Sequence, residues 1–190
     1  MNREQTGRTM VLETVHGSRL YGLAGPDSDY DTYRVVDGGP TTQHVSGNRD
    51  ILQVALDDFL RFCYEGSHQA LEALWSPIKT VCDPRWIAMF SGVQPDMVSA
   101  TSRYVGAIAN MGTRHGKTRI GDYSQISFKH RRHMLRLAKN LDCLYRYGRF
   151  NPVCPPPMVE WLNATAAGSR DMFVAELAAT CPAELENLPF

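Results

Sequence analysis

The spacing of apolar residues divides the chain into a strand-like part and a helix-like part. Short apolar runs at residues 11–15 and 30–36 predict two β-strands, and residues 41–47 and 49–54 predict two more. From Ala55 onward, apolar residues recur every three or four positions, which is the helical period. We therefore expect an α+β fold, in which a small mixed β-sheet is followed by a helical region.

Helical spacing recurs in several segments of the second part. The first predicted helix begins near Leu56 and ends at Gly66. Further helices are predicted at residues 69–75, 84–90, 97–110 and 123–147, and two short helices follow them. A basic, glycine-rich stretch at residues 112–122 predicts a loop, and the CPPP run at residues 154–157 predicts a rigid connector. We expect the two parts to be residues 1–80 and residues 81–190.

The composition gives no global field that would attract nucleic acid. The chain carries 20 Lys and Arg against 20 Asp and Glu, so any polynucleotide contact must come from a local patch. Five dispersed cysteines without metal-binding spacing favour reduced thiols. The sequence lacks the apolar core of a signal peptide and any run of about 18 apolar residues that would span a membrane. We accordingly expect a cytoplasmic protein, and the oligomeric state stays open.

The most informative motif runs from the end of the first predicted strand to the start of the second. Gly17 and Ser18 follow the first strand, and after a gap of ten residues Asp29 and Asp31 flank the start of the second. Backbone N–H groups of such a small-residue pair can approach a phosphate closely. Residues two apart in a strand point to the same face, so the two carboxylates repel each other unless a cation lies between them. Mg²⁺ or Mn²⁺ would suit this pair, because hard cations prefer oxygen ligands and bind nucleotide phosphates.

The string GSRLYGLAGPDSDYD, residues 17–31, resembles the nucleotidyltransferases of the DNA polymerase β superfamily, and among them a branch linked to RNA repair. The resemblance implies that residues 1–80 form a polymerase β-like palm domain with catalytic function. It also implies that residues 81–190 form a helical region packed on this domain. With NTP as substrate, Gly17 and Ser18 would bind the nucleotide phosphates, and Arg19 would meet phosphate or pair with an acid.

The resemblance also implies a third carboxylate on a later strand. Asp50 opens the predicted strand at residues 49–54 and is the candidate. It would share the catalytic and metal-binding role with Asp29 and Asp31, completing a two-metal site. The alternative is that Asp50 is a surface acid at the start of a strand. His16 is expected to be structural. Glu72 lies where the RNA-repair branch has a glutamate and is expected to be structural or to contact the residues that bind the substrate.

A basic face on the longest predicted helix is the second candidate region. At 100° per residue, Lys129, His133 and Arg136 fall within roughly 60° of one another. An apolar stripe lies about 90° away, so this face borders the core, as expected for groups that reach into a cleft. A similar pattern in the RNA-repair branch implies that the three residues bind the nucleotide. The alternative is a solvated basic face, and Arg131 and Arg132 are expected to be surface residues or nucleic-acid contacts.

These observations favour a metal-dependent nucleotidyltransferase, which moves an NMP from an NTP to an acceptor hydroxyl and releases pyrophosphate. The resemblance implies that the acceptor is an RNA end, such as that of a tRNA. Two alternatives stay open. One is a toxin-like or antibiotic-modifying transferase that acts on a protein or small molecule, and the other is a catalytically inactive member that only binds nucleotide or RNA.

Overall fold

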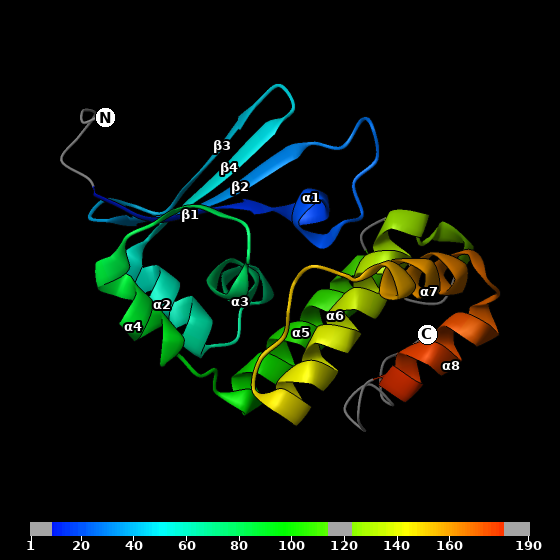
Figure 1. Ribbon diagram of the computed structural model, residues 1–190. Coiled ribbons are helices and arrows are strands. Elements are labelled where there is room, and N and C mark those ends of the chain that lie inside the picture. The colour runs from blue at the N-terminus through cyan, green and yellow to red at the C-terminus, as the bar shows by residue number, and fades with distance from the viewer. Residues whose placement is uncertain (1–8, 114–122, 181–190) are drawn as a thin grey trace. The chain divides into compact units, whose positions relative to one another are not determined.

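The structure is a computed structural model that describes residues 9–113 and 123–180 of the 190-residue chain. Within these residues it is an α+β protein with five strands and eight α-helices (Figure 1). The chain divides into two compact units. We call Met1–Pro95 with Asn151–Cys154 the sheet unit, and Asp96–Phe150 with Pro155–Phe190 the helical unit. The division follows Pro95, whereas the sequence pattern placed the boundary after residue 80.

The sheet unit is built on a mixed five-stranded sheet with the order β3-β4-β2-β1-β5. β1 (Thr9–His16) lies antiparallel to both β2 (Tyr30–Asp37) and β5 (Lys79–Cys82). β4 (Arg49–Ala55) runs parallel to β2 and antiparallel to β3 (Thr42–Ser46). The parallel pair matters for function, because it places the starts of β2 and β4 side by side.

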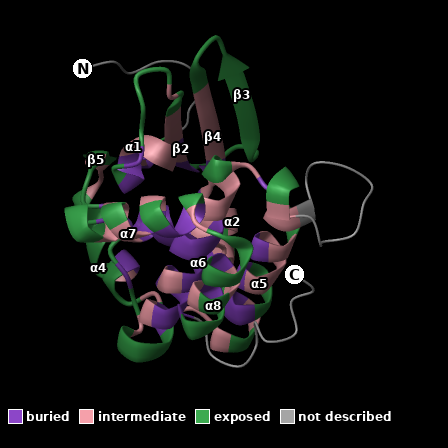
Figure 2. Cartoon of the chain, turned by 90° about the vertical axis from the view of Figure 1, so that its right-hand side faces the viewer, coloured by how far each residue is buried: buried purple, intermediate pink, exposed green. Residues whose placement is uncertain are grey.

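Four helices complete the sheet unit: α1 (Gly17–Tyr21), α2 (Leu56–Tyr64), α3 (His68–Trp75) and α4 (Pro84–Ser91). α2, α3 and α4 lie on one side of the sheet (Figure 1). Apolar side chains from the strands and helices are buried together there, including Leu12, Val35, Val54, Phe59 and Leu71. At the sheet edge, β3 is exposed along its whole length (Figure 2). The core therefore fixes the central strands β1, β2 and β4.

The helical unit contains α5 (Met97–Thr113), a 3₁₀ turn at Tyr123–Gln125, α6 (Phe128–Tyr147), α7 (Pro156–Ala167) and α8 (Arg170–Thr180). α6 packs against α5, α7 and α8 and is the centre of the unit. Its buried apolar stripe consists of Met134, Leu135, Leu137, Leu141 and Leu144. The amphipathic pattern that predicted this helix thus marks the core of the unit.

Most predicted elements are confirmed, with three main differences, of which the first is that the short helix α1 was not predicted. The long helix predicted at residues 123–147 is interrupted, because Ser127 caps α6 by accepting a hydrogen bond from the His130 N–H. The strand β5 was not predicted, since it is short and its side chains are exposed or half-buried. The predicted loop at residues 112–122 lies, from residue 114 onward, outside the described residues. Among the helices described, none is both long and apolar enough to cross a membrane.

Candidate active site

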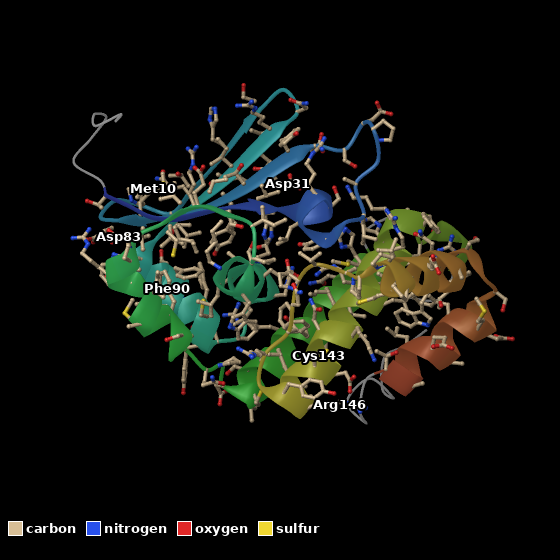
Figure 3. All side chains as sticks on the ribbon, in the orientation of Figure 1. Met10, Asp31, Asp83, Phe90, Cys143 and Arg146 are labelled. Carbon is tan, nitrogen blue, oxygen red and sulfur yellow. The ribbon has the colours of Figure 1, made fainter. Side chains whose placement is uncertain are left out.

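Gly17 lies directly against the carboxylate of Asp31, so the two halves of the sequence motif meet. Gly17 has φ +63°, a backbone conformation that favours glycine. A Cβ atom at this position would lie 1.8 Å from Asp31 Oδ2, which is impossible without rearrangement. Figure 3 shows Asp31 next to α1, the short helix that Gly17 begins. Ser18 is the second residue of this helix, and His16 takes the cap position.

Asp50 is the neighbour of Asp31 on the adjacent strand. The parallel register pairs Asp31 with Asp50, so both side chains point to the same face of the sheet. The Gln43 side-chain amide donates a hydrogen bond to Asp50 Oδ2 at 2.7 Å. The other oxygen, Oδ1, is buried and has no hydrogen-bond partner among the residues that the structure describes. One oxygen of the predicted third acid is therefore held in place, while the other is left for a further ligand.

Asp29 lies in the loop before β2. Its spacing from Asp31 in the sequence had suggested that both acids lie on the strand. Arg19 organises this loop, because Nε donates to the Asp29 carbonyl at 3.1 Å and Nη2 donates to the Ser28 carbonyl at 2.7 Å. The guanidinium also stacks 3.7 Å above the ring centroid of Tyr30. Arg19 thus contacts the backbone that carries Asp29, and the side chain of Asp29 is exposed.

A buried polar layer underlies the motif. Glu72 of α3 is 0% exposed and accepts a hydrogen bond from the Tyr21 hydroxyl at 2.5 Å. His16 places Nε2 3.6 Å from the same Glu72 oxygen, and its ring packs against Tyr33 with a centroid distance of 5.5 Å. Burial raises the pKa of Tyr33 well above its ordinary value, so this phenol stays protonated.

Asp29, Asp31 and Asp50 suit a hard divalent cation for two reasons: they offer oxygen donors, and Asp50 Oδ1 has no hydrogen-bond partner among the described residues. Three carboxylates supply only oxygen donors, which Mg²⁺ and Mn²⁺ prefer. Nevertheless, no three His, Cys, Asp or Glu side chains are gathered into a complete cluster within residues 9–113 and 123–180. Asp31 and Asp50 are strand neighbours, and Asp29 precedes them in an exposed loop. A cation here would need further oxygen ligands, which the phosphates of a nucleotide can provide.

The predicted basic face of the helical unit lies along α6 and becomes more buried toward its middle. Lys129 is exposed, His133 is half-buried, and Arg136 is only 2% exposed. The neighbouring arginines contact aromatic rings of the same unit. Arg131 lies 4.4 Å above the Tyr123 ring centroid, and Arg132 lies 4.9 Å above that of Phe128.

A family model described as "RNA repair pathway DNA polymerase beta family" matches residues 2–179, nearly the whole chain. The chain belongs to this family. The match includes residues 83–122, which carry none of the motifs described above. Membership of the RNA repair pathway DNA polymerase beta family supports a polymerase β-like nucleotidyltransferase in general terms. No curated protein matches the chain closely enough to add a specific activity.

Sequence reasoning left the contacts of Glu72 open and missed Gln43. Glu72 was expected to be structural or to support the binding residues, and the structure places it in contact with Tyr21 of α1. The signal for Glu72 was a glutamate within the apolar segment QALEALW, at a position where the RNA-repair branch resembles this chain. Gln43 carried no signal, because an exposed glutamine in a short edge strand is ordinary.

Proposed function

We propose that the chain is a metal-dependent nucleotidyltransferase that moves an NMP from an NTP to a hydroxyl at an RNA end, releasing pyrophosphate. The observation that carries the proposal is the contact of Gly17 with Asp31, whose strand neighbour is Asp50. Nucleotidyl transfer needs a phosphate-binding turn beside a group of carboxylates. The segments that contain Gly17, Asp31 and Asp50 are separate in the sequence, and together they would provide the phosphate-binding turn and the carboxylates within the sheet unit.

The roles of the residues follow from their chemistry and position. Gly17 and Ser18 would bind the NTP phosphates through their backbone and the Ser18 hydroxyl. The absence of a Cβ at Gly17 lets this backbone lie against the Asp31 carboxylate. Asp29 and Asp31 would hold Mg²⁺ or Mn²⁺ with the NTP phosphates, and Asp50 would complete a second site. When bound, such ions neutralise phosphate charge and favour ionisation of the attacking hydroxyl.

The reaction joins the acceptor oxygen to the α-phosphorus and breaks the bond from that phosphorus to pyrophosphate, while the hydroxyl proton passes to water. Arg19 would keep Asp29 in place by holding the carbonyls of Ser28 and Asp29. Lys129, His133 and Arg136 are proposed to contact the triphosphate, since cations on α6 match its charge. Family membership favours RNA as the acceptor, and tRNA ends fall within this acceptor class.

The test is a labelling screen with the full-length chain, Mg²⁺ and each NTP carrying label at the α-phosphate. Acceptors are total RNA, tRNA, total protein and a set of small hydroxyl compounds. We expect label in RNA, lost in Asp31→Asn and retained in Asp37→Asn, which changes an exposed acid at the far end of the same strand. Label in protein or small molecules would favour the toxin-like or antibiotic-modifying alternative. NTP binding with no labelled acceptor would favour an inactive binding protein.

A further inference from the structure

Glu72 is a fully buried carboxylate in a helix segment whose other buried positions are apolar. Its neighbours in α3, Leu71 and Ala73, are also 0% exposed. Moving a carboxylate out of water is unfavourable unless hydrogen bonds replace its hydration. An apolar side chain would serve packing alone at this position. The reason for a glutamate therefore lies in what its carboxylate contacts.

The Glu72 carboxylate contacts residues on both sides of the Gly17–Ser18 pair. Tyr21, the last residue of α1, donates its hydroxyl hydrogen to Glu72 Oε2 at 2.5 Å. His16, the residue before Gly17, has Nε2 3.6 Å from the same oxygen. The rings of His16 and Tyr21 also pack edge to face, with a centroid distance of 6.1 Å. One carboxylate oxygen of α3 thus connects the start and the end of α1.

The short helix α1 depends on contacts of this kind. Five residues cannot form a stable helix alone, because nucleation is costly and few hydrogen bonds offset it. The Cys154 N–H donates to the Tyr21 carbonyl at 3.2 Å and adds a backbone contact at the end of α1. At the start of α1, Gly17 leaves no space for a Cβ beside Asp31. A small displacement of α1 would therefore change the distance between Gly17–Ser18 and the Asp31 carboxylate.

We infer that Glu72 is a positioning residue, which sets the Gly17–Ser18 pair against Asp31 through its contacts with Tyr21 and His16. The inference rests on the proposed function, because it concerns the phosphate-binding turn and the carboxylate assigned there. It extends that function by adding α3, an element outside the sequence motif, to the machinery that orients the nucleotide. Glu72 acts through Tyr21 and His16 and not by touching the reacting atoms.

Three variants of the full-length chain test the inference. Tyr21→Phe removes the hydroxyl donor and keeps the ring, Glu72→Ala removes the acceptor, and Glu72→Gln keeps an oxygen that can accept from Tyr21. Tyr64→Phe is the matched control, since Tyr64 is 60% exposed at the end of α2. The readouts are amide hydrogen exchange of residues 17–23 without nucleotide, and kcat and KM for NTP.

We expect Tyr21→Phe and Glu72→Ala to accelerate exchange of residues 17–23 and to lower kcat/KM, each by roughly tenfold. Glu72→Gln should restore most of both, and Tyr64→Phe should match the wild type. If Glu72→Ala fails to fold, Tyr21→Phe decides by the same readouts. Unchanged exchange at residues 17–23 in Tyr21→Phe would overturn the inference. If the wild type transfers no NMP, the proposed function fails, while the exchange readout still decides the positioning role.

Discussion

The sheet unit and the helical unit present their candidate residues in different ways. In the sheet unit, Gly17, Asp31 and Asp50 come from separate elements and are brought together by strand pairing and one close backbone contact. In the helical unit, Lys129 and Arg136 come from a single helix and share one face of it, yet one is exposed and the other is buried. The comparison teaches that strand register specifies which atoms meet, whereas a helical face specifies only a direction.

The largest effect is expected at the strand-paired acid of the sheet unit. Asp50→Asn should lower NMP transfer by about 10³-fold, the upper range for loss of one group that stabilises the transition state. NTP affinity should stay near that of the wild type, because Asp50 is assigned to the acceptor side. Steady-state transfer rates and calorimetry with a non-hydrolysable NTP measure the two quantities separately.

The control for Asp50 is Gln43→Ala, which removes the hydrogen bond to Oδ2 and leaves the carboxylate. It should reduce transfer by about tenfold, within the range for groups that orient a metal ligand. A loss of NTP affinity in Asp50→Asn as large as that in Asp29→Asn would contradict the assignment to the acceptor side.

NMP transfer should be almost as sensitive to a substitution at Gly17, which lies in close contact with Asp31. Gly17→Ala forces a Cβ to within 1.8 Å of Asp31 Oδ2 and strains a residue with φ +63°. We expect transfer to fall by about 10²-fold, as for other displacements of about 1 Å at reacting groups. Unfolding should become easier by roughly 1–3 kcal/mol.

Gly25→Ala is the matched control, because a Cβ at Gly25 has nothing within 4 Å. It makes the same chemical change in the loop between α1 and β2, and transfer and thermal stability should stay close to the wild type. Equal losses in the two alanine variants would show that the contact between Gly17 and Asp31 has no special role.

The helical unit is tested by comparing two sets of cations on α6. Removing Lys129 or Arg136 should weaken NTP binding by about 1.5–3 kcal/mol, the scale of a hydrogen bond to a charged group. Arg131→Ala and Arg132→Ala should leave NTP binding intact and reduce only salt-sensitive RNA binding. Because Arg136 is buried, its variant needs a melting curve beside the NTP titration. Equal effects of the two sets on NTP affinity would remove the predicted basic face from the site.

A smaller effect concerns stability at high pH in the sheet unit. Burial raises the pKa values of the Tyr33 phenol and the Cys63 thiol, so both stay protonated when the chain is folded. Their contribution to stability is complete below the pKa values of the unfolded chain and is lost as pH rises above them. The free energy of unfolding should fall by up to about 1.4 kcal/mol per pH unit for each group. Urea titrations between pH 8 and pH 11, on wild type and Cys63→Ala, measure the slope, which the variant should reduce.

Sequence alone predicted the parts of the site that depend on local pattern. The α+β fold and four strands followed from apolar spacing, and the Gly17–Ser18 and Asp29–Asp31 pairs followed from one short motif. Asp50 was predicted from the resemblance, and the register that pairs it with Asp31 required the structure. The link between Tyr21 and Glu72 joins residues 51 positions apart, and no local periodicity encodes such a contact. The position of Asp29 in a loop was also missed, because the conformation of this loop depends on hydrogen bonds from Arg19 to the Ser28 and Asp29 carbonyls.

The most direct test of the account is whether Asp29 and Asp31 make NTP binding depend on a divalent cation. Calorimetry with a non-hydrolysable NTP, with and without Mn²⁺, on the wild type, Asp29→Asn and Asp31→Asn measures this dependence. We predict that Mn²⁺ strengthens NTP binding at least tenfold in the wild type and has little effect in either variant, while all three chains melt at similar temperatures. Equal strengthening by Mn²⁺ in the three chains, or variants that melt far below the wild type, would contradict the account.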